Sequence, residues 1–410
     1  VLMRGTICAA GVYTIPNLHV QGRAVKTNSV PNGAFRGFGG PQVFFSIEMF
    51  MAHIARRLKE DEVQFKLRHV ARQGDITSTG GQYHFPVVVP EMTARILEMS
   101  GYVEKRKRYA REIGGRYRWG IGFALALHGC GFTGNGERDI IQAVARLRGL
   151  ADGKVEILVG NTEMGQGLQT TFAKLVSERM GLPMECILLR EPDTDRVSDA
   201  GPTVASRSIM VVGQLLLRAC DELKAQWKPG QEITVETHYE HPPFMIPFDA
   251  GKLQGDAYPD FSWSANVVEV EVDTLTAEIR VLDAWGVYDV GVPVDRQIVQ
   301  GQMQGGLVQA IGYGSTEKMS YNDKGVIRND HLSDYILPTA MDVGRIEVDF
   351  VINPYPYGPL GAKGAGELPH VGGAPAYLAA VENALHTDLS AIPFSAEDAM
   401  QVLRKGGEIS

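Results

Sequence analysis

The sequence predicts an α+β fold, because its helices and strands occur in separate blocks instead of regular β-α-β alternation. Helical patterns fill residues 44–72 and 90–116 before the first clear strand pattern. Alternation of apolar and polar residues then marks two β-hairpins, at residues 143–160 and 264–291. The 410 residues exceed what one ordinary hydrophobic core holds, so we expect two domains.

The first block is predicted to be helical. Residues 44–72 carry apolar side chains at helical spacing followed by charges, which predicts one or two amphipathic helices. Residues 73–86 form a loop that ends near Pro86, and residues 90–116 indicate a helix, a glycine turn and a second helix. The basic run KRKRYAR is interpreted as a solvated helix face, which is much more common than a nucleic-acid patch.

From Trp119 onward the pattern changes from a helical period to that of strands. Residues 118–129 predict a strand, the first hairpin turns at the sequence ADGK, and a later strand is predicted at residues 343–352. The helices expected between and after these strands cover residues 169–181, 208–227, 296–314 and 372–387, the last with Pro375 near its start.

The boundary between the two expected domains lies between residues 75 and 118. The predicted parts are residues 1–110 and residues 115–410. The chain starts without an initiator methionine, in what reads as the middle of a domain. We therefore expect the first domain to be only partly present and part of any site to lie elsewhere.

Composition excludes several classes of protein. Hydrophobic residues make up 44% and charged residues 21% of the chain, as in ordinary folded proteins. The net charge of −8 gives no electrostatic reason to expect nucleic acid or an anionic membrane as a partner, and no apolar run is long enough to span a bilayer. The cysteines form no C-x-x-C pair, which argues against structural zinc and predicts reduced thiols in a cytoplasmic protein: Cys8, Cys130, Cys186 and Cys220.

Two glycine-rich stretches follow predicted strands. GCGFTG (129–134) fits the dinucleotide pattern G-x-G-x-x-G, but no helix starts there and no β-α-β unit surrounds it, so a Rossmann-type site is not expected. GNTEMGQG (160–167) leads from a strand into a helix, and its backbone N–H groups predict an anion-binding geometry to which Gln166 adds an amide. The alternative is a tight strand-to-helix turn with Gln166 in solvent.

Two further stretches leave alternatives open. SDAGPTVASRS (198–208) combines small and hydroxyl-bearing residues before an apolar helix, which predicts either a second phosphate cradle or helix capping by Ser206 or Ser208. QGQMQGG (300–306) opens a helix with glutamine and glycine where alanine or leucine would be better helix formers. Close helix packing and close approach of a cofactor both explain this choice of residues.

One carboxylate stands isolated near the end of the chain. Glu367 lies in the glycine-rich stretch 358–375, whose one nearby cation is Lys363. If this carboxylate is desolvated, its pKa is expected to rise toward neutrality, which would make it a competent general base. The alternative is an ordinary glutamate in a surface loop.

Several common catalytic motifs are missing from the sequence. It contains no H-E-x-x-H, P-loop or G-x-S-x-G motif, and its ten histidines do not cluster. A catalytic metal held by protein side chains is therefore not expected. The sequence has several glycine-rich loops that could bind an anion, together with one isolated glutamate. This combination favours a large phosphorylated cofactor that performs the chemistry.

Four motifs in this order resemble the molybdopterin-binding subunit of the xanthine dehydrogenase family, the molybdenum hydroxylases. They are AFRGFGGPQ (34–42), EMGQG (163–167), GPTVAS (201–206) and GAKGAGE (361–367). The resemblance covers essentially the whole chain but only the C-terminal part of the usual molybdopterin region. It implies two molybdenum-cofactor-binding domains of mixed sheets and helices, the first only partly present.

The resemblance implies roles for particular residues. Glu367 matches the catalytic glutamate, and Arg36 matches the arginine beside the molybdenum centre. Phe38 and Phe123 match the two phenylalanines that hold a flat aromatic substrate. The further cofactor contacts that it implies are Gly37, Met164, Gly165, Gln166, Ala205, Ser206 and Lys363.

The implied reaction is hydroxylation with water as the oxygen source, in which Glu367 accepts a proton. Electrons then leave through iron–sulfur clusters, usually to FAD. The chain has no cysteine pattern for a [2Fe–2S] cluster and no FAD signature, so both groups are expected on other subunits or domains of a larger assembly. The molybdopterin is expected with or without an attached cytosine nucleotide.

The resemblance also suggests a substrate. Arg4 falls where purine-oxidising members carry an arginine that faces the substrate, so xanthine or hypoxanthine is expected first. The alternative for Arg4 is an exposed residue near a chain end. Ala124 and Val204 depart from the family, which often has a hydroxyl-bearing residue and a smaller alanine there. The alternative substrates are a nicotinate-like heterocycle and an aldehyde. The alternative function is a cofactor-binding module that is inactive without its other half.

Overall fold

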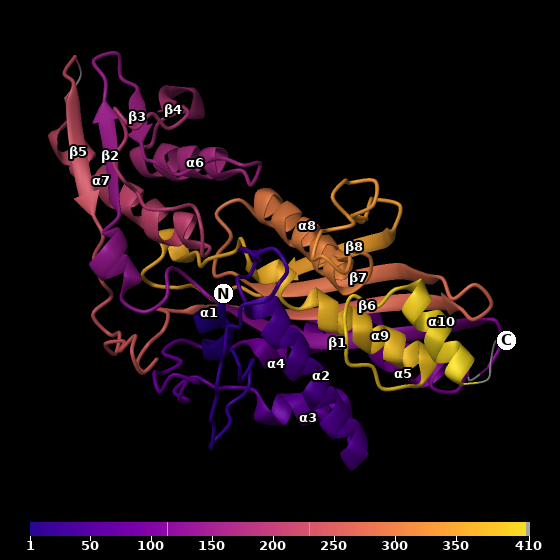
Figure 1. Cartoon of the computed structure of the whole chain (residues 1–410). Coiled ribbons are helices and arrows are strands. Elements are labelled where there is room, and N and C mark those ends of the chain that lie inside the picture. The colour runs from indigo at the N-terminus through magenta and orange to yellow at the C-terminus, as the bar shows by residue number, and fades with distance from the viewer. Residues whose placement is uncertain (113, 229, 407–410) are drawn as a thin grey trace.

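Two four-stranded sheets organise the fold in the computed structural model, which describes residues 1–112, 114–228 and 230–406 (Figure 1). The first sheet has the order β1-β6-β7-β8, with β1 (Tyr117–Gly129), β6 (Phe261–Asp273), β7 (Ile279–Asp289) and β8 (Val343–Phe350). Its first three strands are antiparallel, whereas β8 runs parallel to β7. The hairpin predicted at residues 264–291 is thus the centre of this sheet.

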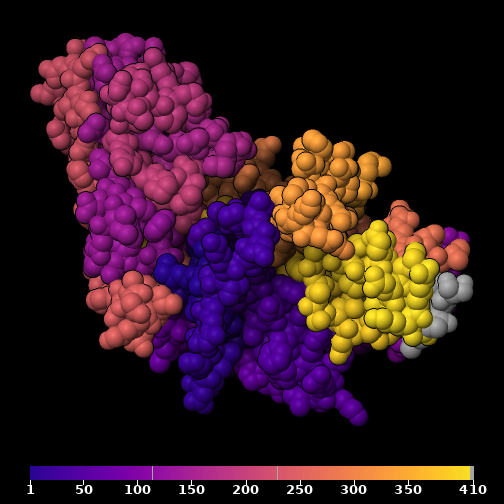
Figure 2. Space-filling view, viewed as in Figure 1, coloured from indigo at the N-terminus to yellow at the C-terminus, as the bar shows by residue number. Residues whose placement is uncertain are grey.

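The second sheet has the order β4-β3-β2-β5 and lies at one end of the molecule. Its strands are β2 (Val144–Gly149), β3 (Val155–Leu158), β4 (Ile187–Leu189) and β5 (Ile233–His238). The helices α6 (Leu168–Met180) and α7 (Gln214–Gln226) lie beside it, and their apolar side chains share a buried cluster with the strands. Figure 2 shows this part as a lobe that projects from the rest of the chain.

The remaining helices surround the first sheet. In the N-terminal part these are α1 (Leu2–Ile7), α2 (Gly40–Leu58), α3 (Glu62–His69), α4 (Val89–Ser100) and α5 (Tyr102–Tyr109). In the C-terminal part they are α8 (Arg296–Gly314), α9 (Gly373–Leu385) and α10 (Ala396–Lys405). No helix among the described residues is both long enough and apolar enough to cross a membrane.

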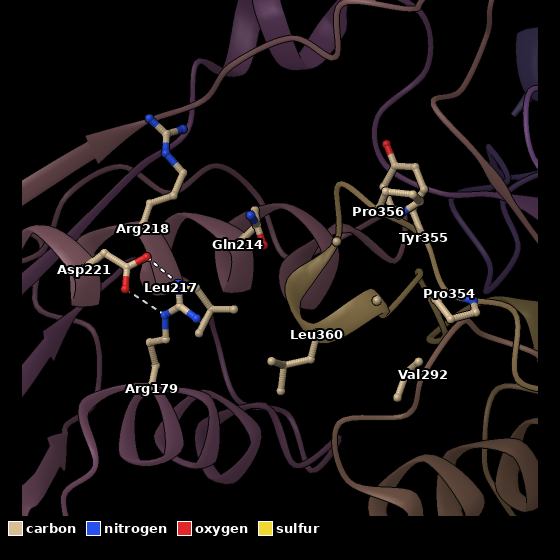
Figure 3. A pocket seen from close by; sticks show the side chains of 12 residues that line it. Arg179, Gln214, Leu217, Arg218, Asp221, Val292, Pro354, Tyr355, Pro356 and Leu360 are labelled. Atoms are coloured by element: carbon tan, nitrogen blue, oxygen red, sulfur yellow. Dashed lines mark hydrogen bonds and ion pairs between the residues drawn. The ribbon is translucent and has the colours of Figure 1, made fainter.

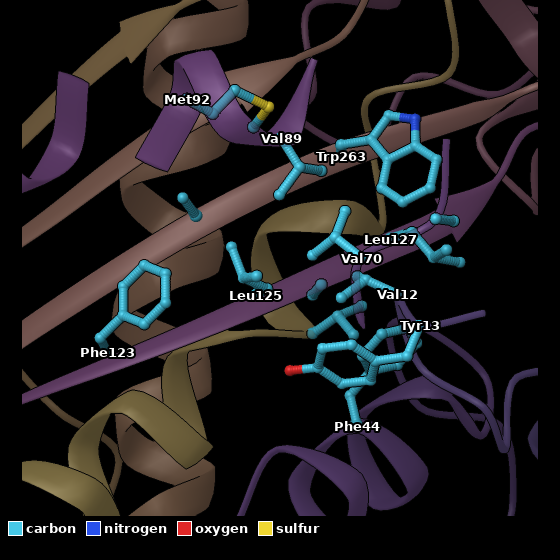
Figure 4. Packing of buried hydrophobic residues seen from close by; sticks show 14 of the residues in the cluster. Val12, Tyr13, Phe44, Val70, Val89, Met92, Phe123, Leu125, Leu127 and Trp263 are labelled. Atoms are coloured by element: carbon cyan, nitrogen blue, oxygen red, sulfur yellow. The ribbon is translucent and has the colours of Figure 1, made fainter. Parts of the chain in front are cut away.

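The two faces of β1 pack against different helices. Phe123 and Leu125 point into a cluster with Met92 of α4 and Trp263 of β6 (Figure 4). This cluster also contains Phe44 of α2, so the N-terminal helices and the first sheet share one core.

The helix α9 covers the opposite face of β1 at very short range. A Cβ on Gly120 would lie 2.0 Å from the carbonyl oxygen of Ala380, and a Cβ on Gly122 would lie 2.2 Å from that of Ala376. Because side chains alternate along a strand, even-numbered residues of β1 face α9 and odd-numbered ones face α4 and α5. This alternation decides which residues of β1 can reach the site described below.

The α+β prediction is confirmed, and the predicted helices and hairpins are present in the order expected. Four of the α-helices and β-strands among the described residues were not predicted: α1, β4, β5 and α10. The helix expected at 208–227 begins with a π-helical turn, η3 (Ser208–Gly213), before α7. All four cysteines are free thiols, as expected, and three of them are buried.

Candidate functional site

Loops that lie far apart in the sequence converge on the carboxylate of Glu367. The backbone N–H of Gly37 donates to its Oε2 at 3.1 Å, and the N–H of Ala205 donates to its Oε1 at 2.8 Å. The N–H of Glu367 itself donates to the hydroxyl of Ser206 at 2.9 Å. Three of the four motifs found in the sequence therefore meet at one side chain.

The fourth motif is tied to this group through side-chain hydrogen bonds. The N–H of Thr162 donates to the hydroxyl of Thr203 at 2.9 Å, and the amide of Asn161 donates to the hydroxyl of Ser208 at 3.3 Å. The EMGQG turn is thereby held beside the GPTVAS stretch. Ser206 and Ser208 engage Glu367 and Asn161 and cap neither η3 nor α7, so the capping interpretation is wrong.

Arg36, the single cation of the first motif, joins that loop to two other segments. Its Nε donates to the carbonyl oxygen of Gly366 at 2.7 Å. Its Nη atoms lie 3.3 Å from the side-chain oxygens of Gln302 and Gln309 on α8. The guanidinium thus holds the loop that ends at Glu367 against α8, and the glutamines of α8 serve as its acceptors.

At two positions around this site neighbouring segments approach the backbone so closely that only glycine fits. A Cβ on Gly306 of α8 would lie 2.4 Å from the ring of Pro369, which follows Glu367 in the short helix η5 (Leu368–His370). A Cβ on Gly364 would lie 2.6 Å from the carbonyl oxygen of Ser206. Close packing, one of the two explanations left open for QGQMQGG, therefore accounts for Gly306.

Three residues around Glu367 adopt backbone conformations that cost free energy. Phe38, Ala205 and Ser206 have φ angles of 43°, 54° and 53°, in the left-handed region that non-glycine residues rarely adopt. Each such residue costs on the order of 1 kcal/mol or more, and such strain is concentrated at functional sites in proteins. The strain here is held in place by the hydrogen bonds to Glu367.

His128 completes the surroundings of Glu367 and was missed by sequence reasoning. Its Nε2 lies 3.1 Å from Oε2 of Glu367, and the side chain is 3% exposed. His128 lies at the end of β1, on the face that points toward α9 and η5. The two residues are 239 positions apart, so their proximity follows only from the packing of the C-terminal segment against the end of β1 in the fold.

The carboxyl of Glu367 is more acidic than an ordinary glutamate. Burial raises its pKa, but the hydrogen bond and charge of His128, the charge of Arg4 and the N–H of Ala205 outweigh burial and lower the pKa to about 2. The predicted rise toward neutrality is therefore wrong, because burial here comes together with donors and a cation. Glu367 is ionised at neutral pH.

Arg4 is buried beside this site and is not an exposed residue of a chain end. It is 5% exposed, its Nη2 donates to the carbonyl oxygen of Gly129 at 2.7 Å, and its Cζ lies 4.9 Å from the ring centre of Tyr258. The positive charge contributes to the lowered pKa of Glu367. Whether Arg4 also faces a substrate stays a prediction.

Phe123 requires a correction. Its side chain is fully buried, its ring centre lies 6.1 Å from that of Tyr102, and the ammonium of Lys66 lies 5.5 Å from it. Phe123 is five residues before His128, so the two side chains lie on opposite faces of β1. The structure places Phe123 in the core with α4 and α5 and does not bring it to Glu367.

Lys363 requires a second correction. Its side chain is fully buried, and its Nζ lies 2.9 Å from Asp289 and 3.1 Å from Asp260, with the carbonyl oxygen of Phe261 at 3.3 Å. The ammonium therefore points into the core beneath the loop that carries Glu367. Lys363 is an anchor of this loop, and its charge is already matched by two aspartates, which leaves no contact for a cofactor.

The EMGQG turn has the predicted anion-binding geometry, but the anion is part of the chain. The carboxylate of Glu163 accepts hydrogen bonds from three backbone N–H groups, those of Gly165 (2.8 Å), Gly167 (3.0 Å) and Gln169 (2.9 Å). The amide of Gln166 bonds back to the backbone of Thr162 and Met164. These donors at the start of α6 are therefore already occupied, and Gln166 does not extend freely into solvent.

The dinucleotide interpretation of residues 129–134 is not supported. β1 pairs with β6 in antiparallel orientation, and the loop after it enters a short π-helix, η1 (Glu137–Ile141). A parallel β-α-β unit is therefore not formed here, as expected.

A separate cleft of about 480 Å³ lies between α6, α7 and residues 354–361 (Figure 3). It is lined on one side by the ion pair of Arg179 and Asp221 and on the other by Tyr355 and Leu360. Neither Glu367 nor His128 lines it, so this cleft is distinct from the site where the loops converge.

Comparison with known families shows the family to which the chain belongs. The family described as molybdopterin cofactor-binding domain matches residues 95–237 and 227–344, and a second family of the same description matches residues 1–70. The chain belongs to the molybdopterin cofactor-binding family of the molybdenum hydroxylases. The resemblance inferred from four motifs is thereby confirmed, together with the expected molybdenum–molybdopterin cofactor.

Curated relatives agree with this family. Xanthine dehydrogenase of Drosophila subobscura is 30% identical over 407 residues, which cover 93% of this chain and 30% of that protein. Xanthine dehydrogenase of rice (Oryza sativa) is 29% identical and covers 84% of this chain and 27% of that protein. A probable xanthine dehydrogenase subunit of Bacillus subtilis is 27% identical and covers 97% of this chain and 56% of that protein. The chain thus spans between about a quarter and a half of the length of these relatives.

Solved structures share the fold. The aldehyde oxidoreductase from Desulfovibrio desulfuricans superimposes with a TM-score of 0.85 at 26% identity, over 98% of this chain and 45% of that one. Quinoline 2-oxidoreductase from Pseudomonas putida superimposes with a TM-score of 0.83 at 21% identity, over 98% of this chain and 57% of that one. The second likeness concerns the fold alone.

The residues around Glu367 fit an anionic pterin cofactor. Met164 and Val204 are 68% and 47% exposed, and a Cβ on Gly165 would meet nothing within 4 Å, so the surface of both loops leaves space for a ligand, although the N–H groups of the EMGQG turn bond within the chain. The buried Oδ1 of Asn161 has no hydrogen-bond partner among the described residues. Arg36 supplies a positive charge at the same place.

Proposed function

We propose that this chain is part of the catalytic subunit of a molybdenum hydroxylase, and that its substrate is a purine, with xanthine or hypoxanthine first. The observation that carries the proposal is the convergence of the AFRGFGG, GPTVAS and GAKGAGE motifs on one ionised glutamate, with a buried arginine beside it. Bound molybdopterin would supply the molybdenum centre, which activates water as the oxygen source and accepts two electrons.

The residues of this chain would prepare the proton transfer. Glu367 is ionised and oriented by donors from three directions, so it can accept a proton from the water-derived hydroxyl without changing its position. Arg4 would stabilise negative charge that develops on a purine oxygen, because a buried guanidinium is a strong donor to an anionic oxygen. Phe38, which is 38% exposed, would pack against the substrate ring.

The cofactor would be held mainly by backbone and small side chains. The residues proposed to contact it are Arg36, Gly37, Met164, Gly165, Gln166, Ala205 and Ser206. The electrons would leave through [2Fe–2S] clusters and FAD on other subunits or domains, and a further part of the molybdopterin region would be supplied by another part of the assembly. The four free thiols suit a cytoplasmic protein.

An aldehyde is the second candidate substrate. It is favoured by the likeness to the Desulfovibrio aldehyde oxidoreductase, the solved structure above whose identity exceeds a quarter. Val204, where a smaller alanine is common in the resemblance, favours a narrower pocket that suits a smaller substrate.

Arg4→Met separates these two candidates. In the assembled enzyme we expect kcat/KM for xanthine to fall by about 100-fold or more, because one charged donor to a developing oxyanion is lost. Turnover of a simple aldehyde, which has no second oxygen for Arg4 to hold, is expected to change far less. Steady-state kinetics with both substrates measure this difference. The matched control is Arg23→Met, which removes an exposed arginine; equal losses on both substrates in Arg4→Met would contradict the purine assignment.

A further inference from the structure

We propose that His128 is a positioning residue that holds the carboxylate of Glu367 in its working orientation and keeps it ionised. This inference rests on the proposed function for the part that concerns turnover. The part that concerns the two side chains stands on their geometry alone, so the two can fail separately.

The first step is the origin of the donors to Glu367. Two of them, the N–H groups of Gly37 and Ala205, belong to loops whose backbone is strained. The third, Nε2 of His128, is a side chain at the end of β1, where His128 lies opposite Ser262 in the antiparallel ladder with β6. A buried side chain on a paired strand has less freedom than a loop. Of the three donors, His128 is therefore the one whose position is most fixed.

The second step is the protonation state of the imidazole. Burial and the charge of Arg4 lower the pKa of His128, so the ring is neutral at neutral pH. An ionised carboxylate can only accept hydrogen bonds, so Nε2 must carry the hydrogen. The other nitrogen, Nδ1, is buried without a hydrogen-bond partner in the part of the chain that the structure describes. A neutral Nε2–H donor holds Glu367 without cancelling the charge that makes it a proton acceptor.

The third step is the set of ionisable groups that act on this pair. Four further groups from the surrounding elements interact electrostatically with Glu367: Arg4 of α1, Arg36 of the loop before α2, Tyr258 of the loop before β6 and His370 of η5. The two arginines stay charged throughout. Burial lowers the pKa of His370 to about 4, and burial raises that of Tyr258 to about 12. Between pH 5 and 8 the environment of Glu367 is therefore constant apart from His128.

The direction of the pH effect on stability follows from the lowered pKa of Glu367. Its pKa of about 2 in the folded chain lies below the value of roughly 4.3 expected in the unfolded chain. The stabilising contribution is therefore fully present above about pH 4.3 and is lost as the pH falls toward 2. Removal of the His128 donor should raise the pKa of Glu367 in the folded chain. The contribution of Glu367 to stability should then be smaller and should be lost at a higher pH.

The test compares His128→Leu, which has no donor, with His128→Gln, whose amide can donate from a similar position. Urea unfolding would be measured from pH 3 to 6, each variant with and without Glu367→Gln. The titration of His370, whose pKa is about 4, is then present in both members of each pair and is removed by the comparison. The difference in unfolding free energy between each variant and its Glu367→Gln partner isolates the contribution of Glu367. In His128→Leu we expect the pH at which this contribution is lost to rise by about one pH unit. In His128→Gln it should return part of the way to wild type, because the amide restores the hydrogen bond but not the charge that a protonated His128 adds at low pH. An unchanged pH dependence in His128→Leu would overturn the proposal.

Two further measurements keep the proposal testable if His128→Leu does not fold. Nitrogen-15 NMR of the wild-type imidazole rings should show His128 neutral with the hydrogen on Nε2, and a hydrogen on Nδ1 would overturn the proposal. In the assembled enzyme, the acidic limb of kcat should move to higher pH in His128→Leu, with KM nearly constant and rescue in His128→Gln. If the wild-type assembly itself has no turnover, the proposed function fails while the unfolding and NMR results still decide the role of His128.

Discussion

Glu367→Gln is expected to lower the turnover of the assembled enzyme by about 10³- to 10⁴-fold, the usual contribution of a general base. The amide keeps the size of the side chain but cannot accept a proton. The molybdenum and pterin content should stay at the wild-type level, because Glu367 is not proposed as a ligand of the metal. Steady-state kinetics together with metal analysis of the same preparation measure both quantities.

The matched control for this variant is Glu98→Gln, which changes an exposed carboxylate at the end of α4. It should leave turnover unchanged. A Glu367→Gln enzyme with full cofactor content and a nearly normal rate would remove Glu367 as the base. The convergence of loops on this carboxylate would then have a purely structural explanation.

Lys363→Met is expected to lower the free energy of unfolding by about 3–5 kcal/mol, because it leaves two buried carboxylates without their counter-ion. Asp289 is fully buried and Asp260 nearly so. Burial already raises the pKa of Asp260 to about 6, although the charge of Lys363 opposes that rise. Denaturant unfolding at neutral pH measures the loss of stability, and lower pH should reduce it as Asp260 takes up a proton.

Lys154→Met is the control for a lysine in an exposed ion pair. Lys154 pairs with Asp152 at 2.8 Å in the turn between β2 and β3, where both side chains are exposed to solvent and the ion pair contributes little to stability. A loss of similar size in both variants would contradict the role of Lys363 as the anchor of the loop that carries Glu367.

The long elements could be predicted because each carries a local signal. The helix α8 was expected at residues 296–314 and extends over Arg296–Gly314, and the side chain of Asp295 caps it by accepting from the N–H of Ile298. The missed helix α10 has a capping box of Ser395 and Asp398 that could have identified it. The missed strand β4 is only three residues long, too short for a clear period. The missed strand β5 is as long as the predicted β2, but no hairpin turn such as ADGK joins it to a neighbouring strand in the sequence.

The motifs of the site could be recognised, but their contacts could not be derived. The resemblance implied a cofactor contact for Lys363, yet the loop turns its side chain into the core toward Asp289. The glutamine amide and backbone N–H groups of the EMGQG turn were expected to meet a ligand, and the chain's own Glu163 occupies the N–H groups. In the first case the partner is distant in the sequence, and in the second it is the first residue of the motif itself, so neither contact followed from recognising the motif.

The lowered pKa of Glu367 shows the limit of local reasoning most clearly. The sequence around it contains glycines and little charge, which predicts desolvation and a raised pKa. The groups that reverse this result, Arg4 and His128, come from α1 and β1 and meet Glu367 only in the fold. The predicted boundary between two domains near residues 110–115 stays a prediction. The N-terminal helices and the first sheet on either side of it share one hydrophobic cluster.

The central claim is that the converging loops hold a molybdenum cofactor. The most direct measurement is elemental analysis of the purified native complex, combined with pterin fluorescence after oxidation. The account predicts stoichiometric molybdenum with pterin. A fully assembled complex that contains neither would contradict the account and would make the glycine-rich loops around Glu367 structural.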